Sequence, residues 1–171
     1  AAAAFEAGAL ATAAQLLGAG RWLLDASVAY AKQRSQYGRE IGQYQAVKHL
    51  LADVATRLEL ARPLLHGAAV ALDGRTDAGT DGAGTDTVAR DVSAAKVACG
   101  EAAHLAARTG LQVHGAVGYT AEHDVGLRLT KVRALVAAWG TTAFHRARVL
   151  DAVRGVGTAG AGQDVREEAH R

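Results

Sequence analysis

The amino-acid sequence predicts an all-α helical bundle. Half of the 171 residues are hydrophobic and only 5% are aromatic, so alanine, leucine and valine must supply most of the core. Small aliphatic side chains favour closely packed helices over a sheet. Apolar residues recur every three or four positions over three long segments, and no segment alternates with the two-residue period of a strand. We therefore expect three long and two shorter helices joined by short connections.

The first two long helices are expected over residues 5–32 and residues 44–72. Glycines within the first would weaken it locally and leave room for another helix to approach; they are Gly8, Gly18 and Gly20. Pro63 lies inside the second helix, where the apolar stripe continues on both sides of it. We therefore expect this proline to kink the helix rather than end it.

The third long helix is expected to begin near Asp86 as its N-cap and to carry its apolar stripe as far as Thr109. Three glycines then break the pattern between residues 110 and 120. Shorter helices are expected over residues 123–136 and residues 141–154.

Two segments are expected to be flexible. Residues 74–86 are rich in Gly, Thr and Asp, which is typical of a surface loop. Their aspartates do not follow the spacing of an EF-hand, and no glutamate closes the segment, so a calcium site is not expected there. Residues 155–171 are Gly-rich and then charged, and are expected to fray. The chain is thus divided into a helical domain over residues 1–154 and a flexible tail.

Charge and residue counts disfavour several classes of function. The net charge is only +2 and the basic residues are spread along the chain, which disfavours nucleic-acid binding. No pair of the seven histidines forms a metal-binding motif, so no metal site is expected. Every 18-residue apolar window carries a polar or charged residue, so membrane insertion is not expected.

The single cysteine, Cys99, excludes an intrachain disulfide and favours a reducing, cytoplasmic setting. It lies on the apolar stripe of the third helix, so we expect a buried and inert thiol. The sequence contains no methionine, and we therefore expect it to be part of a longer or trimmed chain.

Three short clusters carry the most specific pattern. Residues 30–45 read YAKQRSQYGREIGQYQ, residues 112–120 read QVHGAVGYT, and residues 140–142 read GTT and are followed by Arg146. In this order and spacing they resemble motifs of the acyl-CoA dehydrogenase C-terminal domain: Tyr-Ala-x-x-Arg-x-x-Phe-Gly-x-x-Ile with a later Gln, Gln-x-x-Gly-Gly-x-Gly-Tyr, and Glu-Gly-Thr. The resemblance covers residues 5–154.

The resemblance implies a helical domain that completes an FAD site in a homo- or hetero-oligomer and acts on an acyl-CoA or related acyl thioester. The domain of one subunit would hold the FAD of its neighbour, with Arg34 on the pyrophosphate and Gln45 near the adenine. The residues that would surround the nucleotide are Gln112, Val113, His114, Gly115 and Ala116. Those that would face a phosphate or ribose at the start of the last helix are Thr141, Thr142 and Ala143. Gly140 would line the thioester pocket.

The sequence departs from the family pattern at two positions. Ala116 replaces the second glycine of the second cluster. Trp139 stands where most members place the glutamate that removes the α-proton, and an indole cannot accept that proton. Some members place the base on the first helix of this domain, at a position that corresponds to Gly8. Glu6, two residues away, is then a weak candidate for the base, and its plainer interpretation is an exposed first-turn glutamate.

Three hypotheses follow for the function. The chain is the C-terminal domain or subunit of an active FAD-dependent acyl-CoA dehydrogenase whose base lies elsewhere. Alternatively, it is a catalytically silent partner subunit of a heteromeric acyl-CoA dehydrogenase. The third hypothesis is an unrelated helical interaction module.

Overall fold

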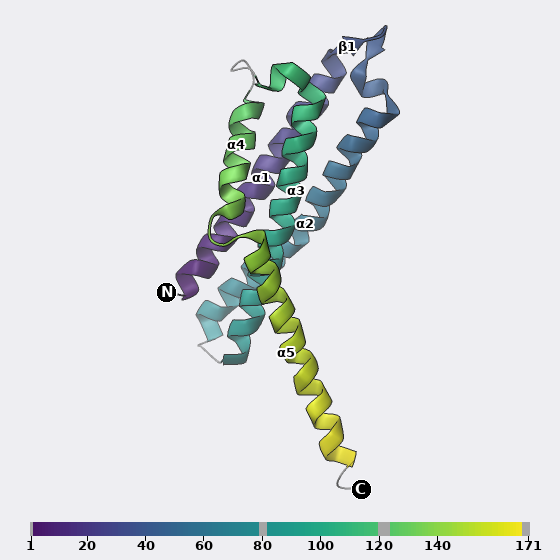
Figure 1. The fold of residues 1–171 in the computed structure, drawn as a ribbon. Coiled ribbons are helices and arrows are strands. Elements are labelled where there is room, and N and C mark those ends of the chain that lie inside the picture. Colours follow the sequence, from purple (N-terminus) through teal and green to yellow (C-terminus); the bar gives the residue numbers. More distant parts are fainter. Residues whose placement is uncertain (1, 79–81, 120–123, 169–171) are drawn as a thin grey trace.

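The computed structural model describes residues 2–78, 82–119 and 124–168 and confirms the all-α prediction. Its helices are α1 (Ala2–Gln33), α2 (Gln45–Ala78), α3 (Gly82–His114), α4 (Val125–Ala137) and α5 (Thr142–Glu168). Helix α3 is central, because it contacts all four of the others. Helices α1, α2 and α3 lie along one another, and α4 runs beside α1 and α3 (Figure 1).

The core is built from aliphatic side chains, as the composition requires. Leu16 and Leu23 of α1, Val54 of α2 and Val132 of α4 are almost completely buried in one cluster. Each such side chain contributes about 1.5–3 kcal/mol on burial. Small residues let the backbones approach closely, since a Cβ atom on Gly20 would lie 3.2 Å from the Cα atom of Ala103 in α3. The expectation that a glycine of the first helix makes room for another helix is confirmed at this position.

The loop expected over residues 74–86 is wrong over most of its length. Helix α2 runs to Ala78 and α3 begins at Gly82, and residues 79–81 lie outside the described residues. Asp86 therefore lies inside α3 and is not its N-cap. A Gly or Asp costs a helix at most about 1 kcal/mol per residue, and packing of α2 against α3 outweighs such propensities.

Helix α3 also continues beyond the glycine that was expected to end it. It passes through Gly110 to His114. A glycine suits this position, where α3 meets α1, because a Cβ atom there would lie only 3.2 Å from Ser27 Oγ. The helix ends at His114, and the next residue, Gly115, has a φ of 61° and stands in the position that favours a left-handed glycine. A 3-10 helix, η2 (Gly115–Tyr119), follows.

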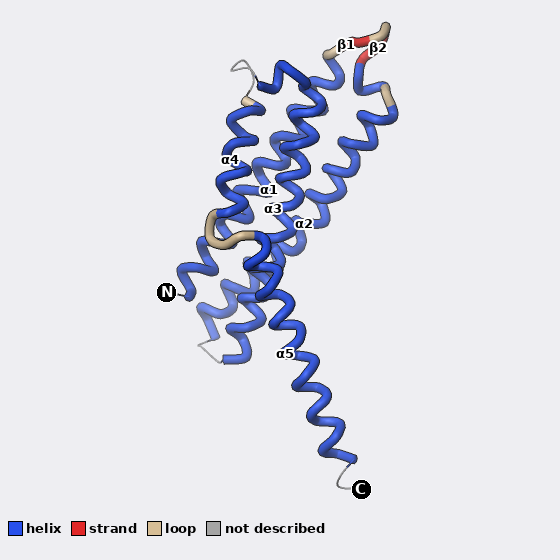
Figure 2. The backbone as a smooth tube through the Cα atoms, viewed as in Figure 1, coloured by secondary structure: helices blue, strands red, loops and turns tan. Residues whose placement is uncertain are grey.

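A small hairpin connects α1 to α2, where no strand was expected. Strands β1 (Ser35–Gln36) and β2 (Arg39–Glu40) pair antiparallel and lead into a 3-10 helix, η1 (Ile41–Gln43). Tyr37 and Gly38 form the turn with φ values of 52° and 80°, as two-residue hairpins of this kind require. Figure 2 shows the two short strands beside each other. Strands of two residues are too short to show an alternating pattern, so sequence periodicity could not reveal them.

Helix α5 continues through the first part of the expected tail and ends at Glu168. Its C-terminal part extends away from the other helices (Figure 1). Helical hydrogen bonds are local, so a helix can extend without a partner to pack against. The expectation that α2 does not end at Pro63 is confirmed, since the proline lies inside the helix.

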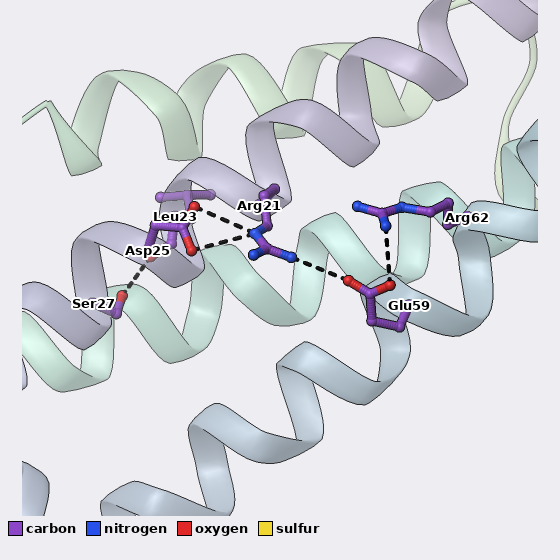
Figure 3. A network of polar contacts seen from close by, with 6 residues as sticks. All are labelled: Arg21, Leu23, Asp25, Ser27, Glu59 and Arg62. Atoms are coloured by element: carbon purple, nitrogen blue, oxygen red, sulfur yellow. Dashed lines mark hydrogen bonds and ion pairs between the residues drawn. The ribbon is translucent and has the colours of Figure 1, made fainter.

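Ion pairs between α1 and α2 lie on the surface of the bundle. Arg21 of α1 pairs with Asp25 on its own helix and with Glu59 of α2 at 3.1 Å, and Glu59 also pairs with Arg62 (Figure 3). All four side chains are more than half exposed. Such pairs contribute about 0–1 kcal/mol, so the aliphatic core decides the stability of this contact.

The expectation of an inert thiol is confirmed at Cys99. Its side chain is fully buried, and burial raises the pKa of the thiol to about 11, although Lys96 opposes the shift.

Among the described helices, α1 is long and apolar enough to cross a membrane, which the sequence did not lead us to expect. The core helix of a bundle meets the same criterion, and α1 buries one face against α2 and α3.

The surface exposes large apolar side chains on α2 and α5. The exposed set includes Leu60, Leu64, Val70, Phe144, Leu150 and Val153. Between α2, α3 and α5 a hollow of about 380 Å³ is lined by Leu60, Leu64 and Val149, so two of these exposed side chains, Leu60 and Leu64, lie at one place.

This surface predicts that the 171-residue chain self-associates in solution, because apolar side chains that share a hollow gain free energy when they are covered. Light scattering coupled to size-exclusion chromatography at several protein concentrations measures this directly. We expect a mass above that of one chain, and it should fall on dilution. A monodisperse monomer over the whole concentration range would contradict the prediction.

Candidate functional site

The predicted site residues fall into two groups on the bundle. Arg34, Gln45 and residues 112–116 lie at the end of the bundle that carries the hairpin, whereas residues 139–143 lie in the connection between α4 and α5 and in the first turn of α5 (Figure 1). Tyr30 and His114 join the first group, because their rings stack with centroids 4.4 Å apart and so bring the ends of α1 and α3 together.

At the hairpin end, the polar side chains of Arg34, Gln45 and Gln112 are all exposed. A hollow of about 570 Å³ beside α3 is lined by Gln112, Gly115 and Arg108, among others. An exposed guanidinium and exposed amides can reach a phosphate or a nucleobase without a conformational change.

Two residues of the second cluster, in contrast, have buried side chains. The side chains of Val113 and His114 are buried, and His114 Nδ1 is hydrogen-bonded to the Gly110 carbonyl oxygen at 2.8 Å. Neither side chain is therefore accessible to a nucleotide. Gly115 and Ala116 are exposed, and a Cβ atom on Gly115 would meet nothing within 4 Å, so the space beside it is open.

A second hollow connects the two groups along α3. It has a volume of about 330 Å³, shares Leu105 and Arg108 with the hollow at the hairpin end, and reaches Thr142 at the start of α5. One face of α3 thus joins Gly115 to Thr142.

Helix α5 begins with a hydroxyl cap. Thr141 Oγ1 accepts a hydrogen bond from the Phe144 backbone N–H at 3.2 Å, and the Thr141 carbonyl accepts one from His145 at 3.1 Å. The N–H groups of Thr142 and Ala143 have no carbonyl one turn earlier within the helix, and they form the positive end of the helix dipole. This terminus suits an anion by its geometry.

Trp139 and Gly140 have a left-handed backbone, with φ values of 56° and 105°. This conformation places the indole against α1 at Gly8, where a Cβ atom would lie only 2.5 Å from Trp139 Cδ2. The two positions at which the family pattern places a carboxylate are thus in contact with each other. In this chain one holds an indole and the other holds no side chain at all.

Aromatic side chains surround Trp139. The ring of Phe5 lies edge-to-face with those of Trp139 and Phe144, at centroid distances of 6.1 and 5.8 Å. The chain has two phenylalanines and two tryptophans, and three of these four residues meet here. Trp139 is 49% exposed and Phe144 is 45% exposed, so the cluster forms part of the surface of this chain.

Glu6 is buried, not exposed, so its plainer sequence interpretation was wrong. Arg148 of α5 binds both of its carboxylate oxygens, with Nη2 2.5 Å from Oε1 and Nη1 3.4 Å from Oε2. The Glu6 side chain is only 5% exposed and that of Arg148 is 24% exposed. Both carboxylate oxygens are thus engaged by the guanidinium and hidden from solvent, which weakens Glu6 as a candidate for the base.

A buried polar chain links this ion pair to the α4–α5 connection. Arg148 Nη1 lies 3.0 Å from Ser93 Oγ, Ser93 Oγ lies 3.0 Å from His145 Nδ1, and His145 Nε2 lies 2.9 Å from the Trp139 carbonyl oxygen. Ser93 and His145 are both fully buried. This series of hydrogen bonds could not be predicted from the sequence, because its members come from three helices and no local motif relates them.

The described residues contain no group of three or more His, Cys, Asp or Glu side chains that could hold a metal ion. The chemistry of the two groups is therefore that of exposed amides, a guanidinium, a helix N-terminus and an aromatic surface.

Comparison with known families decides what this arrangement is. The sequence model described as "Acyl-CoA dehydrogenase, C-terminal domain" matches residues 1–154. This chain belongs to the acyl-CoA dehydrogenase family. The interpretation as an unrelated helical module is therefore wrong.

Curated relatives agree with this assignment. Acyl-CoA dehydrogenase FadE34 of Mycobacterium tuberculosis is 38% identical over 123 residues, which cover 72% of this chain and 16% of the relative. Caffeyl-CoA reductase-Etf complex subunit CarC of Acetobacterium woodii is 31% identical over 137 residues, which cover 80% and 34%. The chain thus spans about a third or less of the length of these curated relatives.

Solved structures of the family share the fold. Butyryl-CoA dehydrogenase from Megasphaera elsdenii superposes with a TM-score of 0.76 at 26% identity, over 87% of this chain and 36% of that one. The glutaryl-coenzyme A dehydrogenase–glutaryl-CoA complex gives a TM-score of 0.78 at 25% identity, over 91% and 37%. The helices described above are therefore those of the family's C-terminal domain.

Proposed function

We propose that this chain is the C-terminal part of an FAD-dependent acyl-CoA dehydrogenase that contributes FAD and oligomer contacts but supplies no catalytic base. The observation that carries the proposal is the contact between Trp139 and Gly8. Neither of these two positions carries a carboxylate, and the Trp139 indole fills the space in which a side chain at position 8 would lie. Removal of an α-proton needs a positioned acceptor, and an indole is not one.

The residues of this chain fit part of an FAD site. Arg34, Gln45 and Gln112 are exposed, the space beside Gly115 is open, and the N-terminus of α5 begins at Thr142. When bound, FAD would accept the hydride from the β-carbon of an acyl thioester. Arg34 would bind the pyrophosphate, the backbone near Gly115 would approach the nucleotide, and the α5 terminus would face a phosphate or ribose. Ala116, which replaces a glycine of the family pattern, is exposed, so its methyl group is not buried against another part of the chain.

The absence of a carboxylate at both Gly8 and Trp139 favours a silent partner subunit over an active dehydrogenase. In such an assembly this chain would complete the FAD site or the interface of a subunit that carries its own base. The acyl group and its carrier, coenzyme A or a protein-bound pantetheine, would then be selected by that other subunit.

Turnover with an acyl-CoA and an artificial electron acceptor tests the proposal. The FAD-loaded protein that contains this chain is assayed alone and after mixing with a neighbouring family subunit. We expect flavin absorbance in both samples, and turnover only where the added subunit supplies a carboxylate. Turnover without such a subunit would contradict the silent role, and failure to bind flavin in either sample would contradict the FAD role.

The role of Arg34 gives a separate prediction. If its guanidinium pairs with a pyrophosphate, Arg34→Ala in the assembled protein should weaken FAD binding by about 1.5–3 kcal/mol. Arg34→Lys should also lose affinity, because an ammonium does not offer the same two-pronged donor. Flavin fluorescence titration measures both affinities.

Arg39 provides the matched control for charge. It is exposed on the same hairpin and stacks on Tyr44 at 4.0 Å, and no nucleotide contact is proposed for it. Arg39→Ala should leave FAD affinity nearly unchanged. Equal affinity losses for the two alanine variants would reduce Arg34 to a general electrostatic contribution.

A further inference from the structure

The α4–α5 connection holds a backbone shape that its sequence does not favour. A left-handed conformation costs a residue with a side chain about 1–2 kcal/mol, and Trp139 adopts it with a φ of 56°. Its neighbour Gly140 tolerates a φ of 105°, but a Cβ atom there would lie 2.8 Å from His145 Nε2. Contacts from outside the connection must therefore fix this shape.

The buried polar chain beside the connection has one direction of donation. The guanidinium of Arg148 can only donate, and the Trp139 carbonyl can only accept. His145 Nε2 therefore donates to the carbonyl, Nδ1 of the neutral imidazole accepts a hydrogen bond from the Ser93 hydroxyl, and Ser93 Oγ accepts one from Arg148. This order fixes one neutral tautomer of the imidazole.

The guanidinium of Arg148, the first donor of this series, is itself held in place by an ion pair. Arg148 is bound by both oxygens of Glu6 on α1, the helix against which the Trp139 indole lies. No buried side-chain nitrogen or oxygen in the described part of the chain lacks a partner, so the polar chain is complete. It connects α1, α3 and α5 to a single carbonyl group.

We propose that Ser93, His145 and Arg148 are positioning residues, which hold the side chain of residue 139 over Gly8 through the Trp139 carbonyl. This positioning does not depend on the proposed function, because it rests on contacts within this chain alone. These three residues act on the backbone of residue 139 and not on its side chain. A different side chain at this position would therefore also be directed to Gly8.

The electrostatics of the site agree with a neutral imidazole. Burial lowers the pKa of His145, and the positive charges of Lys96 and Arg148 act in the same direction. The hydrogen bond to the Trp139 carbonyl and the charge of Glu6 oppose the shift.

The chain contains two tryptophans, which allows an internal control. In a nitrogen–proton correlation spectrum of the 15N-labelled 171-residue chain, each indole N–H gives one signal, and Trp22→Phe assigns them. We expect Ser93→Ala and His145→Leu to shift and broaden the Trp139 signal while the Trp22 signal stays in place. His145→Gln should restore the Trp139 signal, because its amide N–H can donate to the same carbonyl.

Two results would overturn the positioning role. One is an unchanged Trp139 signal in both Ser93→Ala and His145→Leu, and the other is an equal displacement of both indole signals, which would indicate general loosening. The tautomer provides a measurement that needs no destabilising variant. The nitrogen shifts of the His145 ring, assigned by their loss in His145→Gln, should report a proton on Nε2 and none on Nδ1, and the opposite tautomer would also overturn the proposal.

Discussion

Replacement of Trp139 by glutamate is expected to raise acyl-CoA dehydrogenation by about 10²–10⁴-fold, the usual contribution of a positioned general base. The physical reason is that the left-handed backbone at Trp139 and Gly140 already directs this side chain to Gly8. A carboxylate there would occupy the place from which most members of the family remove the α-proton. The measurement is turnover of an acyl-CoA by the FAD-loaded protein with an artificial electron acceptor.

Trp139→Gln is the matched control for this gain. It removes the same indole and has nearly the size of glutamate, but it has no carboxylate to accept a proton. We expect it to remain as inactive as the unaltered protein. Equal gains in the two variants would mean that the indole acts only as a steric block, and no gain in Trp139→Glu would mean that residue 139 is not the base position.

The second large effect is expected on stability, at the ion pair between α1 and α5. Arg148→Met should lower the free energy of unfolding by about 3–5 kcal/mol, because it leaves the buried Glu6 carboxylate without its cation. Ser93 loses a donor at the same time, which adds to the cost. Urea denaturation of the 171-residue chain, followed by circular dichroism, measures the change.

Two controls separate the buried charge from the loss of arginine as such. Glu6→Gln combined with Arg148→Met should recover much of the stability, because no unpaired charge then remains. Arg21→Met, which breaks the exposed pair with Glu59, should cost about 1 kcal/mol or less. Similar losses for Arg148→Met and Arg21→Met would contradict the buried role of the Glu6–Arg148 pair.

The sequence allowed the helices to be predicted wherever apolar spacing was strong. It misplaced their ends for physical reasons that spacing does not contain. Gly110 looked like a break, but it is needed inside α3 to let Ser27 approach. The hairpin over residues 35–40 was too short to show a strand pattern. The end of α5 carries no apolar stripe in its sequence, so spacing could not predict that the helix continues there.

The candidate site was predictable only in part. Counting along the family pattern placed Gly8 and Trp139 as alternative base positions, and the structure brings these two residues into contact. The partner of Glu6 could not be predicted, because Arg148 lies 142 positions away and pairs with it only through the packing of α5 against the bundle. The relay through His145 likewise depends on three-dimensional packing, since that histidine looked solitary in the sequence.

The most direct test of the central claim is the exchange of α-protons in a bound acyl-CoA. The FAD-loaded protein that contains this chain is incubated with an acyl-CoA in D₂O, and deuterium at the α-carbon is followed by mass spectrometry, so that proton removal is measured apart from oxidation. We expect the unaltered protein to exchange α-protons no faster than free acyl-CoA does, and Trp139→Glu to exchange them much faster. Catalysed exchange in the unaltered protein, retained after Glu6→Gln, would show that a base lies elsewhere in the site and would contradict the claim.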